Sequence, residues 1–463
     1  MNSNLLFPIP QNFYQKFRRL MPEEEADVFF EAIELSPSSG VRINRLKLTV
    51  EEFSERAPFK LGEEIPWCAD AFFLPEGQKA GTHPYHQAGL YYLQDPSAMT
   101  PAEMLDPQPE DWVLDLSASP GGKTTQIAAK LRNSGLLVAN EIKNKRLGHL
   151  IQNVERWGAE NVVVTNETPE RLADTFGPIF DKVLVDAPCS GEGMFRKDAS
   201  ARRDWSQELV EGCAIRQKNI LDVAVKLVKP GGKLVYSTCT FSPEEDEGVI
   251  AEILARHPDY KVEDLPAEHG FDHGKPEWIG GEAELSGALR LFPHHVTGEG
   301  HFVCRLVRSV DSVKQRFPKT IHTNVFHQQL ELWEKFIDNV TNQKFKLERL
   351  LIEKERLYYL AEDTPEFGKL RVPMPGLWLG TLKKDRFEPA HPLAMALNPT
   401  AILKKVDLPS DGAQIRKYLR GEPLDTNQSG WLVVMVDGFP IGWGKGVNGI
   451  LKNHFPRGLI SPW

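Results

Sequence analysis

The sequence predicts an α/β protein whose central part forms a mostly parallel sheet, with a small α+β domain before it and a β-rich domain after it. Three observations lead to this prediction. Apolar runs and amphipathic segments alternate between residues 110 and 240, which is typical of parallel strands with helices on both faces. The 463 residues are too many for one core, so several domains are expected. After residue 386 the chain is rich in Gly, Pro and aromatic residues, which favours short strands and turns.

The central alternation predicts a Rossmann-like sheet of seven strands. Five apolar runs are the predicted parallel strands: DWVLDLSAS (111–119), SGLLVANE (134–141), NVVVTNE (161–167), FDKVLVDAP (180–188) and KLVYSTC (233–239). Helices are expected between them, such as PGGKTTQIAAKL (120–131) and KNKRLGHLIQNVERWG (143–158). ALRLFPHH (288–295) and GHFVCRLV (300–307) add a final antiparallel pair at one edge.

The flanking segments have different patterns. Residues 10–35 predict two amphipathic helices separated at Pro22. VRINRLK (41–47) alternates as a half-buried strand does, and would project Arg42, Asn44 and Lys47 from one face. Residues 310–385 are charged and predict mainly helix, and GWLVVMVDG (430–438) predicts a strand. We place the domains at residues 1–78, 79–310, 311–385 and 386–463.

Composition excludes several classes of protein. Hydrophobic residues make up 41% and charged residues 26%, as in soluble globular proteins. The five cysteines contain no CxxC pair, which argues against a disulfide framework or a zinc knuckle and favours a reducing cytoplasm. We expect no metal, no membrane association and no signal peptide, and we favour a monomer. The formal net charge is −9, so any nucleic acid must be bound by local basic patches.

A glycine loop follows the first central strand and begins a helix. In DLSASPGGKTT (115–125), the glycines allow a ligand to approach the backbone, and the helix N-terminus offers free N–H groups. A phosphate-binding P-loop would need glycine where Ser117 stands. The alternative is an S-adenosylmethionine loop, with Glu141 at the end of the next strand to accept both ribose hydroxyls. A plain helix–sheet turn is the third interpretation, and the loop and Glu141 together make it the weakest.

Two cysteines follow the fourth and fifth predicted strands, in Pro-Cys-Ser-Gly and Thr-Cys-Thr turns. Because carboxyl ends of parallel strands meet at one edge, Cys189 and Cys239 are expected to meet near the glycine loop. A thiolate that adds to carbon 6 of a pyrimidine makes carbon 5 nucleophilic enough to take a methyl group. Lys123 is the expected cationic neighbour of the thiolate, and Asp186 the expected acid at N3. The remaining cysteines, Cys68, Cys213 and Cys304, are interpreted as small buried hydrophobes.

These motifs together resemble the NOL1/NOP2/Sun family of RNA 5-methylcytosine methyltransferases. The resemblance rests on DAPCSG, STCT and SPGGKT, and extends from HPYHQAGLYYLQDPSAM near residue 83 to RLFPHHVTGEGHFVCRL at 290–306. VRINRLK is similar to the family's N-terminal RNA-recognition-like segment. The C-terminal GWLVVMVDGFPIGWGKGVNGILKNHFPRGL is similar to the PUA-like domain of the RsmF subgroup, whose members modify cytidine in the decoding region of 16S rRNA.

The resemblance implies a role for each motif residue. Cys239 would be the nucleophile, Cys189 would assist release of the product, and Asp186 would contact the cytosine close to the methyl donor. Glu141 would hold the ribose, and Thr168 would stand at the adenine. The loop residues expected to surround S-adenosylmethionine are Ser117, Ala118, Ser119, Pro120, Gly121, Gly122 and Lys123.

The expected partner is RNA, in the form of 16S rRNA in the 30S subunit. Basic clusters occur in KFRRL (16–20), RINRLK (42–47), FRKDASARR (195–203) and LKNHFPRG (451–458). Each would ordinarily be a solvated surface, but the third directly follows the Cys189 turn and is expected to hold the RNA beside the flipped base. Three alternatives stay open: a tRNA substrate, a P-loop NTPase, and a non-catalytic ribosome assembly factor.

Overall fold

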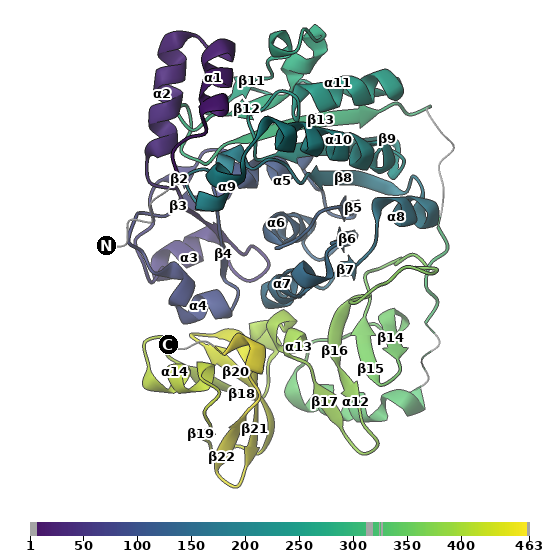
Figure 1. The fold of residues 1–463 in the computed structure, drawn as a ribbon. Coiled ribbons are helices and arrows are strands. Elements are labelled where there is room, and N and C mark those ends of the chain that lie inside the picture. The colour runs from purple at the N-terminus through teal and green to yellow at the C-terminus, as the bar shows by residue number, and fades with distance from the viewer. Residues whose placement is uncertain (1–6, 312–317, 324, 326, 461–463) are drawn as a thin grey trace.

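A computed structural model describes residues 7–311, 318–323, 325 and 327–460. Its central sheet has the order β11-β12-β13-β9-β8-β5-β6-β7, with β10 paired to β13 (Figure 1). The β5 to β9 strands pair in parallel, and β13 is antiparallel to β9. The predicted Rossmann-like sheet is confirmed, and two short strands, β10 and β11, extend the expected seven. The strands are β5 (Trp112–Asp115), β6 (Leu136–Asn140), β7 (Val162–Thr165), β8 (Phe180–Asp186), β9 (Val228–Thr238), β10 (Tyr260–Val262), β11 (Asp272–His273), β12 (Leu289–Leu291) and β13 (His301–Arg308).

Helices cover both faces of this sheet, because successive side chains of each buried strand point to opposite sides. Val113 packs with α5, α6 and α7 on one face, and its neighbour Leu114 packs with α8, α10 and α11 on the other. The helices are α5 (Thr100–Leu105), α6 (Gly122–Leu131), α7 (Asn144–Trp157), α8 (Pro169–Phe176), α9 (Ala199–Asp204), α10 (Gln207–Ala224) and α11 (Glu247–Arg256).

A four-stranded sheet of order β2-β3-β1-β4 precedes the central sheet and packs against α6. Arg42 on β1 is fully buried, and donates to the Gly122 carbonyl and the Thr125 hydroxyl, both at 2.9 Å. Asn44 is also buried and Lys47 donates to two carbonyls. The expectation that RINRLK forms a solvated basic face is therefore wrong for these side chains, which join two parts of the chain instead. The elements are β1 (Gly40–Ile43), α3 (Val50–Arg56), β2 (Glu64–Ile65), β3 (Cys68–Phe73), α4 (Pro84–Gln87) and β4 (Tyr91–Gln94).

The two predicted N-terminal helices are α1 (Gln11–Leu20) and α2 (Glu23–Glu34). Their apolar faces pack against the segments that follow β8 and β9 rather than against the N-terminal sheet. The Phe13 ring lies 5.0 Å from that of Phe195, and the Phe29 ring lies 5.2 Å from that of Phe241. The first two helices thus support the loops that carry Cys189 and Cys239.

Residues 327–396 form a small mixed domain. The prediction of mainly helix here is wrong from residue 350 on, since only α12 (His327–Val340) and α13 (His391–Ala396) are longer helices among its described residues. Leu350–Tyr359 instead forms a hairpin whose two-residue turn places Lys354 at a φ of 57°. The apolar and aromatic residues of this hairpin pack in a core between the sheet and α12, and this packing stabilises strands here rather than a charged helix. The sheet is β14 (Leu350–Glu353), β15 (Arg356–Tyr359), β16 (Leu377–Leu382) and β17 (Phe387–Pro389).

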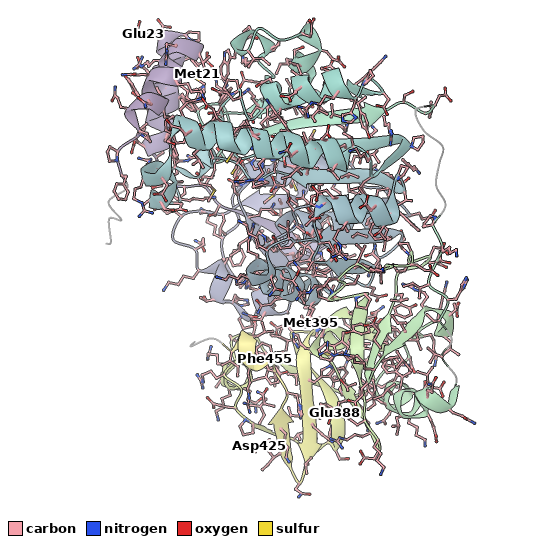
Figure 2. The ribbon with its side chains drawn as sticks, turned by 45° about the vertical axis from the view of Figure 1, so that its right-hand side comes forward. Met21, Glu23, Glu388, Met395, Asp425 and Phe455 are labelled. Carbon is pink, nitrogen blue, oxygen red and sulfur yellow. The ribbon has the colours of Figure 1, made fainter. Side chains whose placement is uncertain are left out.

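The C-terminal sheet has the order β18-β20-β21-β22-β19 and confirms the predicted strand at 430–438. It lies at the opposite end of the molecule from the α1–α2 turn, as the labels Asp425 and Glu23 show (Figure 2). No helix among the described residues is long and apolar enough to span a bilayer. The proposed domain boundaries stay predictions. The elements are β18 (Lys405–Leu408), α14 (Ala413–Leu419), β19 (Leu424–Asp425), β20 (Gly430–Val436), β21 (Phe439–Val447) and β22 (Ile450–Asn453).

Candidate active site

The glycine loop lines a cavity of about 220 Å³ at the carboxyl edge of the central sheet. Gly121 adopts a φ of 112° at the start of α6, a conformation that side chains other than glycine rarely take. The loop residues in the wall are Ser117, Ala118, Ser119, Pro120, Gly122 and Lys123, and Asp186 closes the far side. The structure therefore brings the predicted loop and the Pro-Cys motif strand to one pocket.

Asp186 connects the cavity to the cysteine turns. Its Oδ2 atom accepts a hydrogen bond from Lys123 Nζ at 2.7 Å, and its Oδ1 atom accepts one from Ser237 Oγ at 2.8 Å. His301 Nε2 lies 3.7 Å from the same Oδ1 atom. The parallel pairing of β8 and β9 sets Asp186 opposite Ser237, two residues before Cys239.

Electrostatics make Asp186 an anion in this structure. Burial alone would raise the pKa of Asp186, but its interactions with the charged Lys123 and with His301 outweigh burial and hold the pKa well below its usual range. Asp186 also raises the pKa of Lys123 against the effect of burial, so Lys123 keeps its proton. The predicted role of Asp186 as the acid at N3 is thus not favoured, because the proton of this pair lies on Lys123.

The two motif cysteines meet, as the sequence predicted. Cys189 Sγ and Cys239 Sγ are 3.2 Å apart, and both side chains are partly exposed. The hydrogen bond with Cys239, together with burial, raises the pKa of the Cys189 thiol well above its usual range. Either sulfur can be the donor in this contact. Lys123 also interacts electrostatically with Cys239, as expected for a cation beside a nucleophilic sulfur.

The remaining cysteines, Cys68, Cys213 and Cys304, are buried, in agreement with their interpretation as core residues.

Glu141 and Thr168 lie at the same edge of the sheet but outside the walls of the cavity. Glu141 is buried just after β6, where its Oε1 atom accepts from the Lys143 backbone N–H at 2.7 Å. Thr168 caps α8 by accepting from the backbone N–H of Arg171. Their roles at the ribose and the adenine stay predictions.

Several residues at the cavity were not found from the sequence. Asp115 at the end of β5 was within reach of sequence reasoning, because it directly precedes the glycine loop. Tyr92 and Gln94 also line the cavity and come from β4 of the N-terminal sheet. His301, on the antiparallel strand β13, lies outside the cavity wall but next to Asp186. No local pattern marks Tyr92 and Gln94, since only the packing of the N-terminal sheet against α6 brings them to the site. His301 comes near Asp186 through the antiparallel pairing of β13 with β9.

The basic segment 195–203 differs from its prediction. Arg196 forms an ion pair with Glu299, its Nε atom lying 2.8 Å from a carboxylate oxygen, and both side chains are almost fully buried. Arg202 is buried as well, and donates to Glu34 on α2 and to the Ile33 carbonyl. The predicted role in RNA binding is therefore wrong for these two arginines, which join the loop to neighbouring elements. Arg203 is exposed, and a role for it at RNA stays a prediction.

The cavity suits a cationic ligand such as S-adenosylmethionine. Asp115 is 1% exposed, and its Oδ1 atom accepts no hydrogen bond from any residue in the described part of the chain. Burial raises the pKa of Asp115 to about 7, although a hydrogen bond from Thr124 opposes this. A buried carboxylate in the wall of a pocket, with one oxygen that lacks a donor, is a site where a cationic or N–H group of a ligand would be stabilised.

Asp186→Asn is expected to lower stability at neutral pH. The Lys123 side chain is 12% exposed and that of Asp186 is 30% exposed, so losing the partner of Lys123 costs about 1–2 kcal/mol after solvent screening. Because the folded-state pKa of Asp186 is depressed, its stabilisation is present above the ordinary carboxyl value, near 4, and is lost as the pH falls below it.

Urea denaturation of the wild type and the variant at pH 7, 5 and 3 measures this difference. The difference in the free energy of unfolding between wild type and Asp186→Asn should be equal at pH 7 and 5 and smaller at pH 3. The matched control is Asp174→Asn on the exposed side of α8, which should leave stability unchanged. Equal stability of Asp186→Asn and wild type at pH 7 would contradict the ion pair's contribution.

Comparison with known families agrees with this geometry. A family model described as "16S rRNA methyltransferase RsmB/F" matches residues 102–307. Three further models match the flanking segments: the N-terminal domain of 16S rRNA methyltransferase RsmF at 9–96, the RsmF rRNA methyltransferase first C-terminal domain at 335–397, and the methyltransferase RsmF PUA domain at 405–461.

Curated relatives match over the whole chain. A protein of Vibrio parahaemolyticus named ribosomal RNA small subunit methyltransferase F is 33% identical over 98% of both chains. One of the same name from Erwinia tasmaniensis is 32% identical over 97% of this chain and 96% of its own.

Solved structures share the fold. A methyltransferase homolog protein from Pyrococcus horikoshii has a TM-score of 0.55 and 30% identity, and the match covers 65% of this chain and all 100% of that one. NSun6 from the same organism, solved with SFG, has a TM-score of 0.56 at 22% identity, over 65% of this chain and 98% of its own, and supports the fold alone. From the domain matches and the full-length relatives together, this chain belongs to the RsmF family of ribosomal RNA small subunit methyltransferases.

Proposed function

We propose that the chain forms 5-methylcytidine in the decoding region of 16S rRNA, through a temporary bond between Cys239 and carbon 6 of the target cytosine. The observation that carries the proposal is the pair of sulfurs 3.2 Å apart, next to the Lys123–Asp186 pair and the glycine-loop cavity. The usual interpretation of a free cysteine as a small buried core residue does not fit these two thiols, which are partly exposed and in contact at the ends of two buried strands.

The first step is nucleophilic addition by Cys239. Its thiolate forms a bond to carbon 6, the carbon 5–carbon 6 double bond opens, and N3 takes a proton. Carbon 5 then has enamine character and can form a new carbon–carbon bond. Lys123 is charged, contacts Asp186 and interacts electrostatically with the sulfur, so it would supply the proton that N3 takes. Asp186, as an anion, is suited to accept a hydrogen bond from the cytosine amino group.

S-adenosylmethionine, which methyltransferases of this family use, supplies an electrophilic methyl group when it is bound. The chain's own part is to bind and orient it. Ser117 to Lys123 would surround it, Asp115 would meet its cationic end, and Glu141 and Thr168 would contact the nucleoside portion. The carboxylates that line the cavity, Asp115 and Asp186, would favour a positively charged ligand.

Release requires that the carbon 5 proton leave and the sulfur–carbon 6 bond break. Cys189 is the side chain next to the nucleophile. Because its raised pKa keeps it a thiol in the resting pair, it would first lose its proton to water and then take the carbon 5 proton as a thiolate. The electrons of the carbon–hydrogen bond then rebuild the carbon 5–carbon 6 double bond, and Cys239 departs with the electrons of its bond to carbon 6. N3 returns its proton to the group that supplied it, Cys239 leaves as a thiolate and Cys189 is again a thiol, so both cysteines are back in their starting states.

The proposed partner is 16S rRNA in an assembled 30S subunit, bound by a monomer in the cytoplasm without a metal. The family match and the names of the full-length relatives support a ribosomal substrate over tRNA. The P-loop alternative is disfavoured because Ser117 stands in place of its first glycine, and the cavity is lined by two carboxylates, Asp115 and Asp186. An assembly factor without activity is disfavoured by the paired sulfurs.

Bisulfite sequencing tests the substrate. A strain without the gene should lose one or more protected cytidines in 16S rRNA and keep all protected cytidines in tRNA. Complementation with the wild type should restore protection, and complementation with Cys304→Ala, a change in the core of β13, should do so equally. Loss of protection in tRNA alone would establish the alternative substrate.

A further inference from the structure

We propose that Glu192 and Glu245 are positioning residues that join the two cysteine turns and set the distance between the two sulfurs. The inference rests on the proposed roles of Cys189 and Cys239 and deepens that function. Glu192 belongs to the loop after β8, three residues beyond Cys189, and Glu245 to the loop after β9, six residues beyond Cys239. Each carboxylate reaches across to the other loop, so the two act as a reciprocal clamp.

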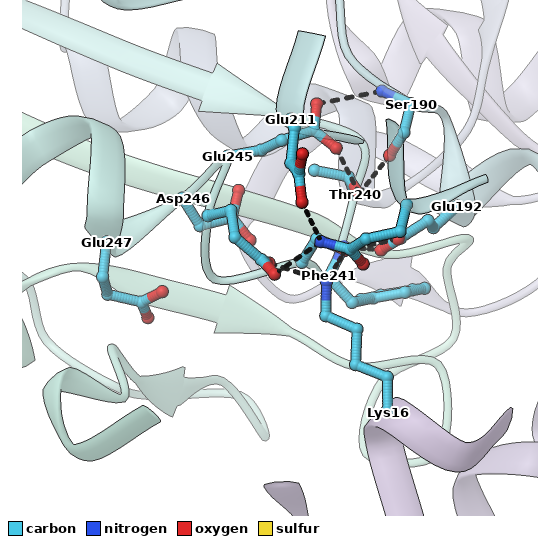
Figure 3. A network of polar contacts seen from close by, with 12 residues as sticks. Lys16, Ser190, Glu192, Glu211, Thr240, Phe241, Glu245, Asp246 and Glu247 are labelled. Carbon is cyan, nitrogen blue, oxygen red and sulfur yellow. Dashed lines mark hydrogen bonds and ion pairs between the residues drawn. The ribbon is translucent and has the colours of Figure 1, made fainter. Parts of the chain in front are cut away.

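Glu245 holds the Cys189 turn from the side of β9. Its Oε2 atom accepts from the Ser190 backbone N–H at 3.0 Å and from Gln217 Nε2 at 2.8 Å. Its Oε1 atom lies 3.4 Å from the Thr240 hydroxyl, which is itself 2.8 Å from the Ser190 hydroxyl. Figure 3 shows Glu245, Ser190 and Thr240 in one group. The residue after each cysteine is therefore tied to a single carboxylate.

Glu192 holds the Cys239 turn from the side of β8. Its Oε2 atom accepts from the Phe241 backbone N–H at 2.8 Å, and its Oε1 atom accepts from the Ser242 hydroxyl and from Trp205 Nε1. The next residue, Gly193, donates its backbone N–H to the Cys239 carbonyl at 2.8 Å. Three of these hydrogen bonds, those to Phe241, Ser242 and the Cys239 carbonyl, thus fix the turn that carries the proposed nucleophile.

The two carboxylates are buried, Glu192 at 1% and Glu245 at 0% exposure. Burial of a carboxylate is energetically unfavourable unless hydrogen-bond donors surround it. Each carboxylate and its donors therefore hold one another in place. Neither side chain lines the cofactor cavity. Their contacts are with residues adjacent to the cysteines, which is why they position the sulfurs rather than touch the reacting atoms.

The two carboxylates differ in which of their hydrogen-bond partners could also accept a hydrogen bond. A Glu→Gln substitution is therefore expected to have different effects at the two positions. At Glu192 every partner donates: Phe241 and Trp205 through N–H groups, and Ser242 through its hydroxyl. Lys16 Nζ donates to Ser242 Oγ at 2.8 Å, which leaves the hydroxyl proton for Glu192. A glutamine at 192 would face at least one of these donors with its own NH₂ group. The Glu192→Gln variant must therefore lose a contact.

At Glu245 a glutamine would fit. Its carbonyl oxygen would keep the Ser190 and Gln217 bonds, and its NH₂ group would face Thr240, whose hydroxyl oxygen can accept. Burial and the charge of Glu192 raise the pKa of Glu245 to about 7, so a neutral group is tolerated at this place. We therefore expect Glu245→Gln to rescue what Glu245→Ala loses.

The first measurement reports on the sulfurs without any RNA. Diamide takes two electrons and two protons from a pair of thiols, and the bridge between Cys189 and Cys239 is followed by peptide mass spectrometry. A disulfide needs the two sulfurs to approach to about 2.05 Å in a defined orientation. We expect bridging to be several-fold slower in Glu192→Gln and Glu245→Ala, and at the wild-type rate in Glu245→Gln.

The second measurement is steady-state methyl transfer to 30S subunits. Glu192→Gln and Glu245→Ala should lower kcat by about 10- to 100-fold, because a shift of about 1 Å at reacting groups has such an effect. KM for RNA and for S-adenosylmethionine should change less than about twofold, since neither residue contacts them. Glu208→Gln is the matched control: it makes the same change at an exposed position in the first turn of α10, and should behave as wild type in both assays.

If Glu245→Ala proves unstable, Thr240→Val removes only the hydroxyl that joins Ser190 to Glu245, and should also slow bridging. Bridging at the wild-type rate in folded Glu192→Gln and Thr240→Val would overturn the clamp. Slower bridging with unchanged kcat would support the clamp and overturn the proposed roles of the cysteines. The two failures are thus distinguishable.

Discussion

Cys239→Ala is expected to lose methyl transfer to 30S subunits by on the order of 10⁴-fold or more, because removing a nucleophile removes the covalent path itself. The sulfur lies at the end of β9, in contact with Cys189 and within electrostatic reach of Lys123, and no other thiol among the described residues takes this place. Transfer of a labelled methyl group from S-adenosylmethionine measures the effect.

Cys304→Ala serves as the control for this prediction, because it also removes a thiol but from the core of β13. Its activity should equal that of the wild type, and the melting temperature of both variants should stay close to the wild-type value. Full turnover by Cys239→Ala would show that another group adds to the ring.

Cys189→Ala is expected to accumulate a covalent protein–RNA adduct with turnover reduced to a small fraction. Addition by Cys239 does not need the Cys189 sulfur, whereas removal of the carbon 5 proton and elimination do in the proposed scheme. A denaturing gel after incubation with S-adenosylmethionine and 30S subunits should show a slowly migrating species that contains labelled protein and RNA.

The matched control is the double variant Cys189→Ala with Cys239→Ala, which should show no such species because the attacking sulfur is absent. The alanine at 189 also removes the hydrogen bond between the two sulfurs, so the rate of adduct formation is measured alongside its yield. Normal turnover without an adduct in the single variant would assign release to a different residue.

The sequence determined the arrangement of the catalytic edge because local patterns define it. The alternation of buried strands and helices from residue 111 onward implies a parallel sheet, and in such a sheet all carboxyl ends lie together. Residues that directly follow strands, namely the glycine loop, Asp186, Cys189 and Cys239, were therefore predictable as neighbours. The structure places the glycine loop and Asp186 in the wall of the cavity, and it places the sulfurs of Cys189 and Cys239 in contact.

Charge state and exposure were less predictable than position. Asp186 was expected to donate a proton, but the pKa depends on Lys123 and His301, which other elements supply. Arg42, Arg196 and Arg202 were expected at the surface because of their charge. Each is instead buried against acceptors from a distant part of the chain, and these acceptors compensate for the loss of water.

What the sequence by itself determined is the order of strands and helices and the chemistry carried at strand ends, because periodicity and turn residues act over a few positions. What only the tertiary structure decided is how the separate units meet: β4 at the cofactor cavity, α1 and α2 beneath the cysteine loops, and Glu192 and Glu245 across from each other. The physical reason is that a buried polar group is stable only next to a hydrogen-bond or charge partner. Segments that are distant in sequence supply these partners, and only the packing of the chain brings them together.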